Sequence, residues 1–301
     1  MRRFWPLILF VIIFIVAVLG LNNPVISTSI SSSQSPQRII SLAPSITESL
    51  FALGLGDKIV AVTDYCDYPP AARELKKVGG YINPNLETIV GLQPDLVILL
   101  AGHTRTVTQL AQLNIKTLVV NNSTLLGIQQ TINSIGQRTG RQQQADVLLA
   151  TIQQKIAIVT DKVSGQERPK VMIAMGHSMG NEQLKQIYIA GQHDFYNDLI
   201  SLAGGINVYQ KSTPKVPSLS IEGIMQLNPD IILDIFPEED DHQTDLIQAK
   251  QRWQKLHYVN AIQHNRIHII EENYATIPGP RIFQLLEQIA MLIHPNLDWS
   301  K

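Results

Sequence analysis

A block of residues occurs twice in this chain at a constant spacing. Residues 86–98 and residues 221–233 align without a gap, and the offset between Glu87 and Glu222 is 222 − 87 = 135 positions. The two copies also keep isoleucine, leucine, proline and aspartate in register. A repeat of this kind predicts two similar lobes, and a cleft between two lobes is a natural place for a ligand. The paired glutamates further predict a symmetric docking surface.

The length and composition agree with a two-lobed globular protein. With 301 residues, the chain can bury two ordinary cores. The hydrophobic share of 45% and the charged share of 16% argue against a disordered chain. A formal net charge of −1 provides no basic surface that would predict nucleic-acid binding. The single cysteine, Cys66, excludes an internal disulfide framework and a metal site with several thiolate ligands.

Residues 1–37 have the pattern of an export signal followed by a flexible spacer. Arg2 and Arg3 precede an unbroken apolar run at residues 7–19, and a serine-rich tract follows at residues 27–35. We therefore expect a cleaved signal and a soluble exported protein. No cysteine follows the apolar run, which excludes a lipid-anchored lipoprotein. The run is close to the length of a membrane span, so an uncleaved anchor is the alternative.

Residues 38–140 are predicted to form the first lobe, because short apolar runs alternate there with helical segments. Ser45 and Glu48 have the spacing of a capping box at the start of a helix. Asn85 is the expected cap of the helix that carries Glu87. The predicted strands are residues 38–43, 59–62, 96–100 and 116–120, and the predicted helices include residues 45–53 and 106–113.

Residues 141–165 are predicted to connect the lobes as one long helix. Apolar side chains recur at helical spacing from residue 142 to residue 163, which corresponds to about 33 Å of helix. A rigid helix of this length limits how far two lobes can close. Residues 166–298 are predicted to form the second α/β lobe. Its strands are expected at residues 171–175, 187–190, 231–235 and 266–270, and its helices at residues 195–203 and 281–293.

Several segments together resemble the periplasmic substrate-binding proteins of iron-siderophore and cobalamin importers. They are residues 38–48, residues 64–70, both repeated blocks, the pair Gly204 and Gly205, and residues 278–281. The resemblance extends from residue 38 to the C-terminus, and residues 66–70 look most like the cobalamin-binding branch. It implies an α/β fold of two small lobes with parallel-rich sheets, joined by one long helix, with the ligand cleft between the lobes.

This resemblance implies a non-catalytic function. The protein would be a monomer in the periplasm that carries cobalamin or a related corrinoid, as a transported ligand and not as a cofactor, to an ABC importer made of a permease dimer and its ATPase. A ferric siderophore or haem is the alternative ligand. The resemblance further implies that Glu87 and Glu222 engage arginines of the permease. The alternative for each glutamate is a helix position near N2 that complements the helix dipole.

The resemblance also assigns a ligand site. By position, Tyr65, Tyr81 and Tyr274 match the aromatic side chains that pack against the flat corrin ring. The family often has tryptophan at the last two of these positions. His103 and His177 follow strands of the first and second lobes, where one of them is expected to reach the metal centre or a polar edge of the ligand unless both are solvated. The eight histidines are scattered, so direct capture of a metal ion is a minor alternative.

A hydrolase is the alternative from another class. Residues 176–180 match the G-x-S-x-G nucleophile elbow directly after a predicted strand, with Ser178 as the nucleophile. Asp234 and either His257 or His268 follow in the Ser–acid–His order. However, the segment after the elbow is polar and short, no oxyanion motif precedes it, and a lobe repeat has no place in a single hydrolase domain. We therefore expect a binding protein and not an enzyme, with an exported esterase as the distant alternative.

Overall fold

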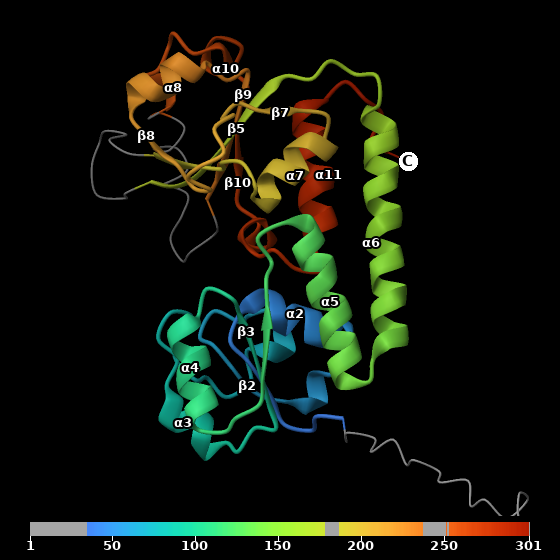
Figure 1. The fold of residues 1–301 in the computed structure, drawn as a ribbon. Helices are drawn as coiled ribbons and strands as arrows, with labels where there is room; N and C mark the ends of the chain where they lie inside the picture. The colour runs from blue at the N-terminus through green and yellow to red at the C-terminus, as the bar shows by residue number, and fades with distance from the viewer. Residues whose placement is uncertain (1–34, 178–186, 237–250, 252, 301) are drawn as a thin grey trace, which may run out of the picture. The chain divides into compact units, whose positions relative to one another are not determined.

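Two α/β lobes make up the part of the chain that this computed structural model describes, which is residues 35–177, 187–236, 251 and 253–300 (Figure 1). Nearly all of the predicted export signal and spacer lies outside these residues, and so does Ser178. No helix within the described ranges is long and apolar enough to cross a membrane.

The first lobe is built on a sheet of four parallel strands in the order β2-β1-β3-β4. β1 and β3 are buried nearly throughout, in agreement with their apolar sequences, because helices cover both faces of a parallel sheet. The strands are β1 (Ile39–Ser41), β2 (Ile59–Val62), β3 (Leu96–Leu100) and β4 (Thr117–Val120), and the helices are α2 (Pro44–Ala52), α3 (Leu86–Gly91), α4 (Thr104–Gln112) and α5 (Leu125–Thr139), with short 3-10 turns η1 (Gly56–Lys58) and η2 (Pro70–Ala72).

The second lobe contains a mixed sheet in the order β10-β9-β5-β6-β8, with β7 paired to β5. β10, β9, β5 and β7 run parallel, whereas β6 and β8 continue the sheet in antiparallel pairs. The two sheets confirm the predicted parallel-rich α/β class. The strands are β5 (Lys170–His177), β6 (Ile187–Ile189), β7 (Ile206–Asn207), β8 (Ser218–Leu219), β9 (Ile231–Ile235) and β10 (Ile267–Ile270), and the helical elements are α7 (Phe195–Leu202), α8 (Ile221–Leu227), α10 (Asn260–Gln263), η3 (Asn273–Thr276) and α11 (Ile282–Ile293).

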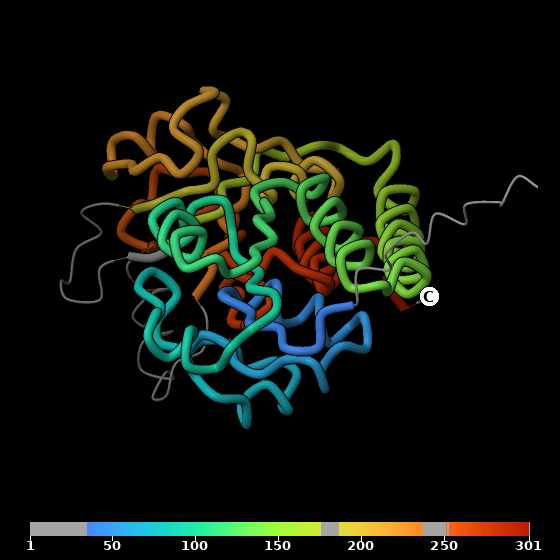
Figure 2. The backbone as a smooth tube through the Cα atoms, turned by 60° about the horizontal axis from the view of Figure 1, so that its bottom comes forward, coloured from blue at the N-terminus to red at the C-terminus, as the bar shows by residue number. Residues whose placement is uncertain are grey.

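Helix α6 (Gln142–Val163) connects the lobes and occupies the residues predicted for it. Its side chains at Ala145, Ile152 and Val159 are buried at regular intervals along one face. α6 packs against α5 of the first lobe and α11 of the second, and it lies beside α5 in both views (Figure 1, Figure 2). Because α6 contacts helices of both lobes, any change in lobe spacing would disturb the packing along it.

The predicted capping box at Ser45 and Glu48 is wrong. α2 begins at Pro44, and its N-cap residue, Ala43, forms no side-chain capping hydrogen bond. Both Ser45 and Glu48 are buried inside the helix. The Glu48 carboxylate contacts Arg281 of the second lobe, so a tertiary contact replaced the local one.

Helix α5 is absent from the sequence-based prediction, although its ends carry ordinary signals. The Thr124 hydroxyl caps the helix by accepting a hydrogen bond from the N–H of Gly127. Gly140 ends it in the left-handed conformation, with φ at 71°. Between these caps, Ile128, Ile132 and Ile135 are buried at helical spacing, and the helix packs against both α6 and β4.

The two repeated blocks fold alike. β3 and β9 begin 231 − 96 = 135 positions apart, which is the offset of the sequence repeat. Asn85 caps α3 and Ser220 caps α8, each through a side-chain oxygen that accepts a backbone N–H. Gln93 and Asn228 also correspond, and both have a positive φ (47° and 46°) where the helix ends before a proline. The repeat in sequence is therefore a repeat in structure.

Candidate ligand site and docking surface

The two lobes touch beyond the carboxyl ends of their parallel strands. Asn122, just after β4, donates from Nδ2 to the Pro278 carbonyl of the second lobe at 2.9 Å and to the Ser45 hydroxyl at 3.0 Å. The N–H of Leu125 donates to a carboxylate oxygen of Asp198 on α7 at 2.8 Å. Ligands of open α/β sheets bind outside the carboxyl ends of the strands. This junction is therefore the candidate ligand site.

An arginine of the second lobe lies at the centre of this junction. Arg281 precedes α11 and binds both carboxylate oxygens of Glu48 on α2, with 2.9 Å between Nε and Oε2. The Arg281 and Glu48 side chains keep only 11% and 2% of their surface exposed. Burial raises the pKa of Glu48, although the hydrogen bonds and positive charge of Arg281 oppose the rise. The pair is thus a buried charged link between the lobes.

Two tyrosines flank the same guanidinium group. The central carbon of Arg281 lies 3.8 Å from the ring centre of Tyr68 and 5.6 Å from that of Tyr274. Tyr274, a predicted ligand residue on η3, is half-buried and donates its hydroxyl to Gln288 Oε1 at 3.2 Å. Tyr68 and Arg281 belong to segments that carried the family resemblance, yet sequence reasoning gave neither a role. Their contact joins residues far apart in the chain, and no local pattern signals it.

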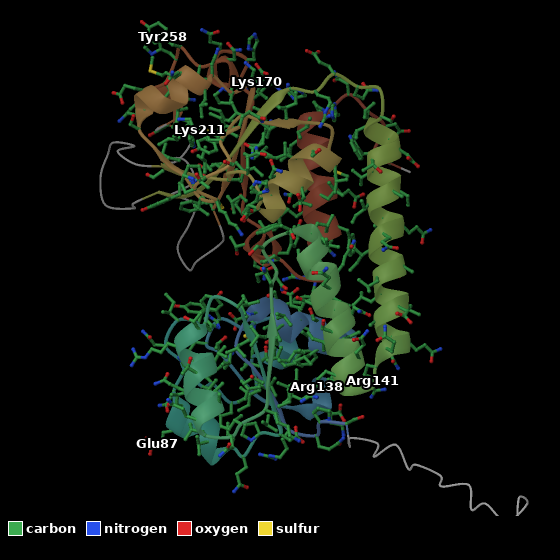
Figure 3. All side chains as sticks on the ribbon, viewed as in Figure 1. Glu87, Arg138, Arg141, Lys170, Lys211 and Tyr258 are labelled. Atoms are coloured by element: carbon green, nitrogen blue, oxygen red, sulfur yellow. The ribbon has the colours of Figure 1, made fainter. Side chains whose placement is uncertain are left out.

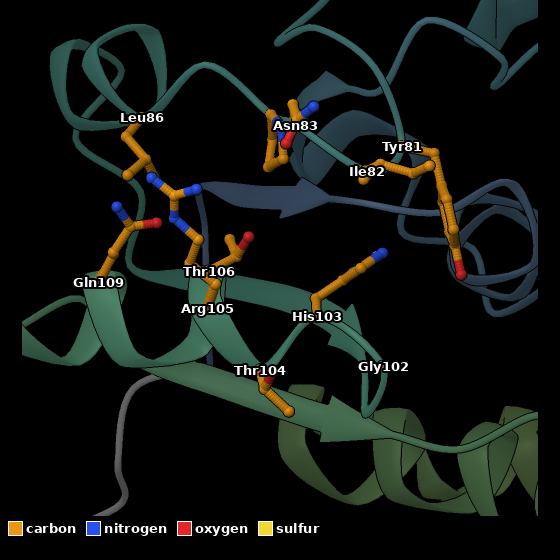
Figure 4. A pocket seen from close by; sticks show the side chains of 11 residues that line it. Tyr81, Ile82, Asn83, Leu86, Gly102, His103, Thr104, Arg105, Thr106 and Gln109 are labelled. Carbon is orange, nitrogen blue, oxygen red and sulfur yellow. The ribbon is translucent and has the colours of Figure 1, made fainter.

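Tyr81 and His103, two further predicted ligand residues, lie together. Their ring centres are 4.5 Å apart in an edge-to-face arrangement. Both line a pocket of about 570 Å³ in the first lobe, and Figure 4 shows the two side chains at one end of it. His103 is 9% exposed, and neither ring nitrogen has a hydrogen-bond partner among the described residues. Burial lowers the pKa of His103, which favours the neutral form of the imidazole.

The other two predicted ligand residues are at the carboxyl ends of strands. Tyr65 follows β2 and is 68% exposed. His177 is the last residue of β5, and its side chain lies outside the described part of the structure. Within the described residues, Tyr65 makes no ring contact with Tyr81 or Tyr274. The ligand roles of all five residues stay predictions.

The repeated glutamates occupy the same position on two short helices. Glu87 is the second residue of α3 and Glu222 the second residue of α8, and both are exposed. Figure 3 shows Glu87 pointing outward from α3. Hydrogen bonds from Ser220 and from its own backbone N–H lower the pKa of Glu222. Neither carboxylate forms an ion pair within the described ranges, so each is available to an outside partner.

An exposed apolar side chain accompanies each glutamate. Val90 lies three positions after Glu87 and Met225 three positions after Glu222, so each shares a helix face with its carboxylate. Val90 is 43% exposed and Met225 is 40% exposed. The sequence repeat places these two residues in register, but only the structure shows that both face solvent. Each lobe therefore presents the same pairing of charge and apolar surface.

Ser178 lies outside the described residues, which include part of what the metal-ion and hydrolase alternatives need. No group of histidine, cysteine, aspartate and glutamate side chains there could hold a metal ion. Asp234 is fully buried and accepts a hydrogen bond from Trp253 Nε1 at 2.7 Å. His257 packs on the exposed ring of Tyr258, with 4.0 Å between the ring centres.

Comparison with known proteins supplies the family. The sequence profile of the family described as "Periplasmic binding protein" matches residues 39–274. The chain belongs to this periplasmic binding protein family. Its family consists of substrate-binding components of transport systems and not of enzymes.

Curated relatives of this periplasmic binding protein include an ABC transporter substrate-binding lipoprotein and a vitamin B12-binding protein. An uncharacterized ABC transporter substrate-binding lipoprotein of Bacillus subtilis, YvrC, is 28% identical over 275 residues, which cover 89% of this chain and 83% of the relative. The vitamin B12-binding protein of Vibrio cholerae is 29% identical over 265 residues, which cover 84% of this chain and 87% of the relative.

Solved structures of the family agree with the two-lobed fold. The periplasmic vitamin B12 binding protein BtuF of Vibrio cholerae superposes with a TM-score of 0.74 at 26% identity, over 87% of this chain and 98% of that one. The periplasmic heme-binding protein RhuT of Roseiflexus superposes with a TM-score of 0.74 at 25% identity, over 86% of this chain and 98% of that one. The family thus includes proteins named for corrinoid and for haem.

Proposed function

We propose that this periplasmic binding protein carries cobalamin or a related corrinoid to an ABC importer. The observation that carries the proposal is a pair of half-buried tyrosine rings, Tyr81 from the first lobe and Tyr274 from the second, which both pack on the hydrophobic core that the lobes share. Rings from two sides suit a large, flat and partly apolar ligand. The 29% identity with a vitamin B12-binding protein supports the same ligand.

Haem or another iron chelate is the second candidate, and one observation favours it. The ring nitrogens of His103 have no partner among the described residues, and burial lowers the pKa of the imidazole. A neutral imidazole is a common ligand of haem iron. The similarity to a heme-binding protein at 25% identity agrees with this candidate.

The proposed route of delivery uses the two repeated helices. Glu87 and Glu222 would dock on arginines of a permease dimer, because equal carboxylates on two rigid lobes fit a two-fold partner. Val90 and Met225 would add an apolar contact beside each ion pair. The protein itself would need no cofactor, act as a monomer and reach the periplasm through the export signal within residues 1–37.

A calorimetric titration of the purified protein with cyanocobalamin tests the ligand, with haemin titrated in parallel. Saturable binding of cyanocobalamin at one site, at sub-micromolar concentration, supports the corrinoid function. Tyr81→Ala and Tyr274→Ala should then each weaken binding by roughly threefold to tenfold. Tyr258→Ala is the matched control, because that ring is 67% exposed in the second lobe. Binding of haemin alone favours the second candidate, and binding of neither contradicts both.

A further inference from the structure

The pocket that Tyr81 and His103 line also contains a positively charged side chain, Arg105. Among the described residues that line the pocket, Arg105 is the one charged side chain, and the other polar groups are amides, hydroxyls and the imidazole. Arg105 is exposed and has no ion pair or hydrogen bond through its side chain with another described residue. Figure 4 shows its guanidinium with Gln109 and Leu86 at the end of the pocket opposite to Tyr81. No acidic side chain opposes this positive charge among the described lining residues.

The first turn of α4 also lines this pocket. His103 is the N-cap of α4 and makes no side-chain capping hydrogen bond. The backbone N–H groups of Thr104, Arg105 and Thr106 have no acceptor among the described residues. Free N–H groups at the positive end of a helix dipole favour an anion. The helix and the arginine thus favour the same sign of ligand charge.

The imidazole of His103 is an independent sign of a missing partner. It is nine-tenths buried, and neither ring nitrogen is hydrogen bonded within the described residues. Buried polar atoms nearly always have a partner in folded proteins, because an unpaired one costs the desolvation of that group. The Tyr81 ring lies edge to face against the imidazole.

We propose that this pocket receives an oxyanion group of the transported ligand, either a carboxylate or a phosphate ester. The group accepts hydrogen bonds from the Arg105 guanidinium and from the first N–H groups of α4, and His103 lines the same pocket. This inference rests on the proposed function, and it names the part of the ligand that the first lobe recognises. Cobalamin carries a phosphodiester and haem carries propionates, so each candidate ligand has a group of the required chemistry.

Two pairs of ligands distinguish the phosphodiester of cobalamin from the propionates of haem as the bound group. Cyanocobalamin is compared with dicyanocobinamide, which lacks the phosphodiester, and haemin is compared with its dimethyl ester, which lacks the free carboxylates. Each is titrated into the full-length wild-type protein and into the Arg105→Gln variant. The variant should bind the member of each pair that carries the oxyanion roughly tenfold more weakly, and the member that lacks it equally well. Arg105→Lys keeps the charge and should recover part of the loss.

Arg138→Gln is the matched control, because Arg138 is an exposed arginine in the last turn of α5 and does not line the pocket (Figure 3). It should leave all four affinities unchanged. An equal loss for both members of a pair, or no loss for either, would overturn the oxyanion pocket while leaving the proposed function in place. If the wild-type protein binds none of the four ligands, the proposed function and this inference are both wrong.

Discussion

Arg281 joins the second lobe to the first by holding the carboxylate of Glu48, which lies 233 positions earlier in the chain. The pair is buried, and the Tyr68 ring covers the guanidinium at 3.8 Å. With the hydrogen bonds of Asn122, it ties α2 to the segment just before α11. This link and helix α6 hold the two lobes together at the candidate ligand site, which favours a cleft that closes little.

The buried pair should cost stability when one partner alone is removed. Glu48→Gln is expected to lower the free energy of unfolding by about 3 kcal/mol, because it leaves the Arg281 charge buried without its partner. The double variant Glu48→Leu with Arg281→Met should be closer to wild type than the single variant, since it buries no charge. Urea unfolding measures both. Asp57→Asn breaks the exposed pair with Lys58 and should change the free energy by less than about 1 kcal/mol.

The repeated glutamates should be required for transport and not for ligand binding. Glu87→Ala combined with Glu222→Ala is expected to reduce ligand uptake at least about tenfold, because both docking ion pairs are lost. Ligand affinity should not change, since both side chains point to solvent outside the pocket. Uptake by cells and titration of the purified variant give the two readings. An equal fall in affinity would place these glutamates in the ligand site or in the fold.

The apolar residues beside the glutamates should contribute to the same contact. Val90→Ser with Met225→Ser is expected to weaken docking on the permease by roughly tenfold, because each removes apolar surface from a helix face that carries the carboxylate. Binding to permease reconstituted in vesicles measures this effect. Val147→Ser provides the control, since Val147 is 63% exposed on α6, far along the chain from both blocks. If this control weakens docking as much, the effect is not specific to the repeated helices.

Asp194 should make stability fall as pH rises through the mildly acidic range. Burial and the charge of Asp198 raise its pKa to about 6, despite the N–H of Tyr196 and the charge of Lys215. Between the unfolded pKa of 3.8 and this value, the folded protein holds a proton that the unfolded chain has lost. Asparagine does not titrate in this range, so the stability of the Asp194→Asn variant lacks this pH dependence.

The stability of Asp194→Asn relative to wild type should therefore grow between pH 4 and pH 7, by at most roughly 3 kcal/mol. Unfolding by urea at several pH values measures the difference, and the pH trends of other groups cancel when the two proteins are compared. A difference that stays constant with pH would show that Asp194 does not titrate in this window.

Local patterns in the sequence were sufficient for much of the fold. The helical period between residues 142 and 163 predicted α6 with its observed bounds. Apolar residues at this spacing fall on one face only when the segment is an α-helix. The repeat predicted two matching helix–strand units, and Asn85 and Ser220 cap them as expected. Helix α5 went unpredicted although Ile128, Ile132 and Ile135 form a buried stripe at helical spacing.

The sequence by itself determined the two-lobed α/β class, the connecting helix and the equivalence of Glu87 and Glu222, because each depends on spacing along the chain. Only the tertiary structure decided what Glu48 does, since its contact with Arg281 overrides the capping box that its neighbours predict. The same holds for the meeting of Tyr81 with His103. Burial depends on the packing of the whole chain and not on any local segment. In the folded chain, the His103 imidazole is buried with no hydrogen-bond partner among the described residues, and it lines the same pocket as Arg105.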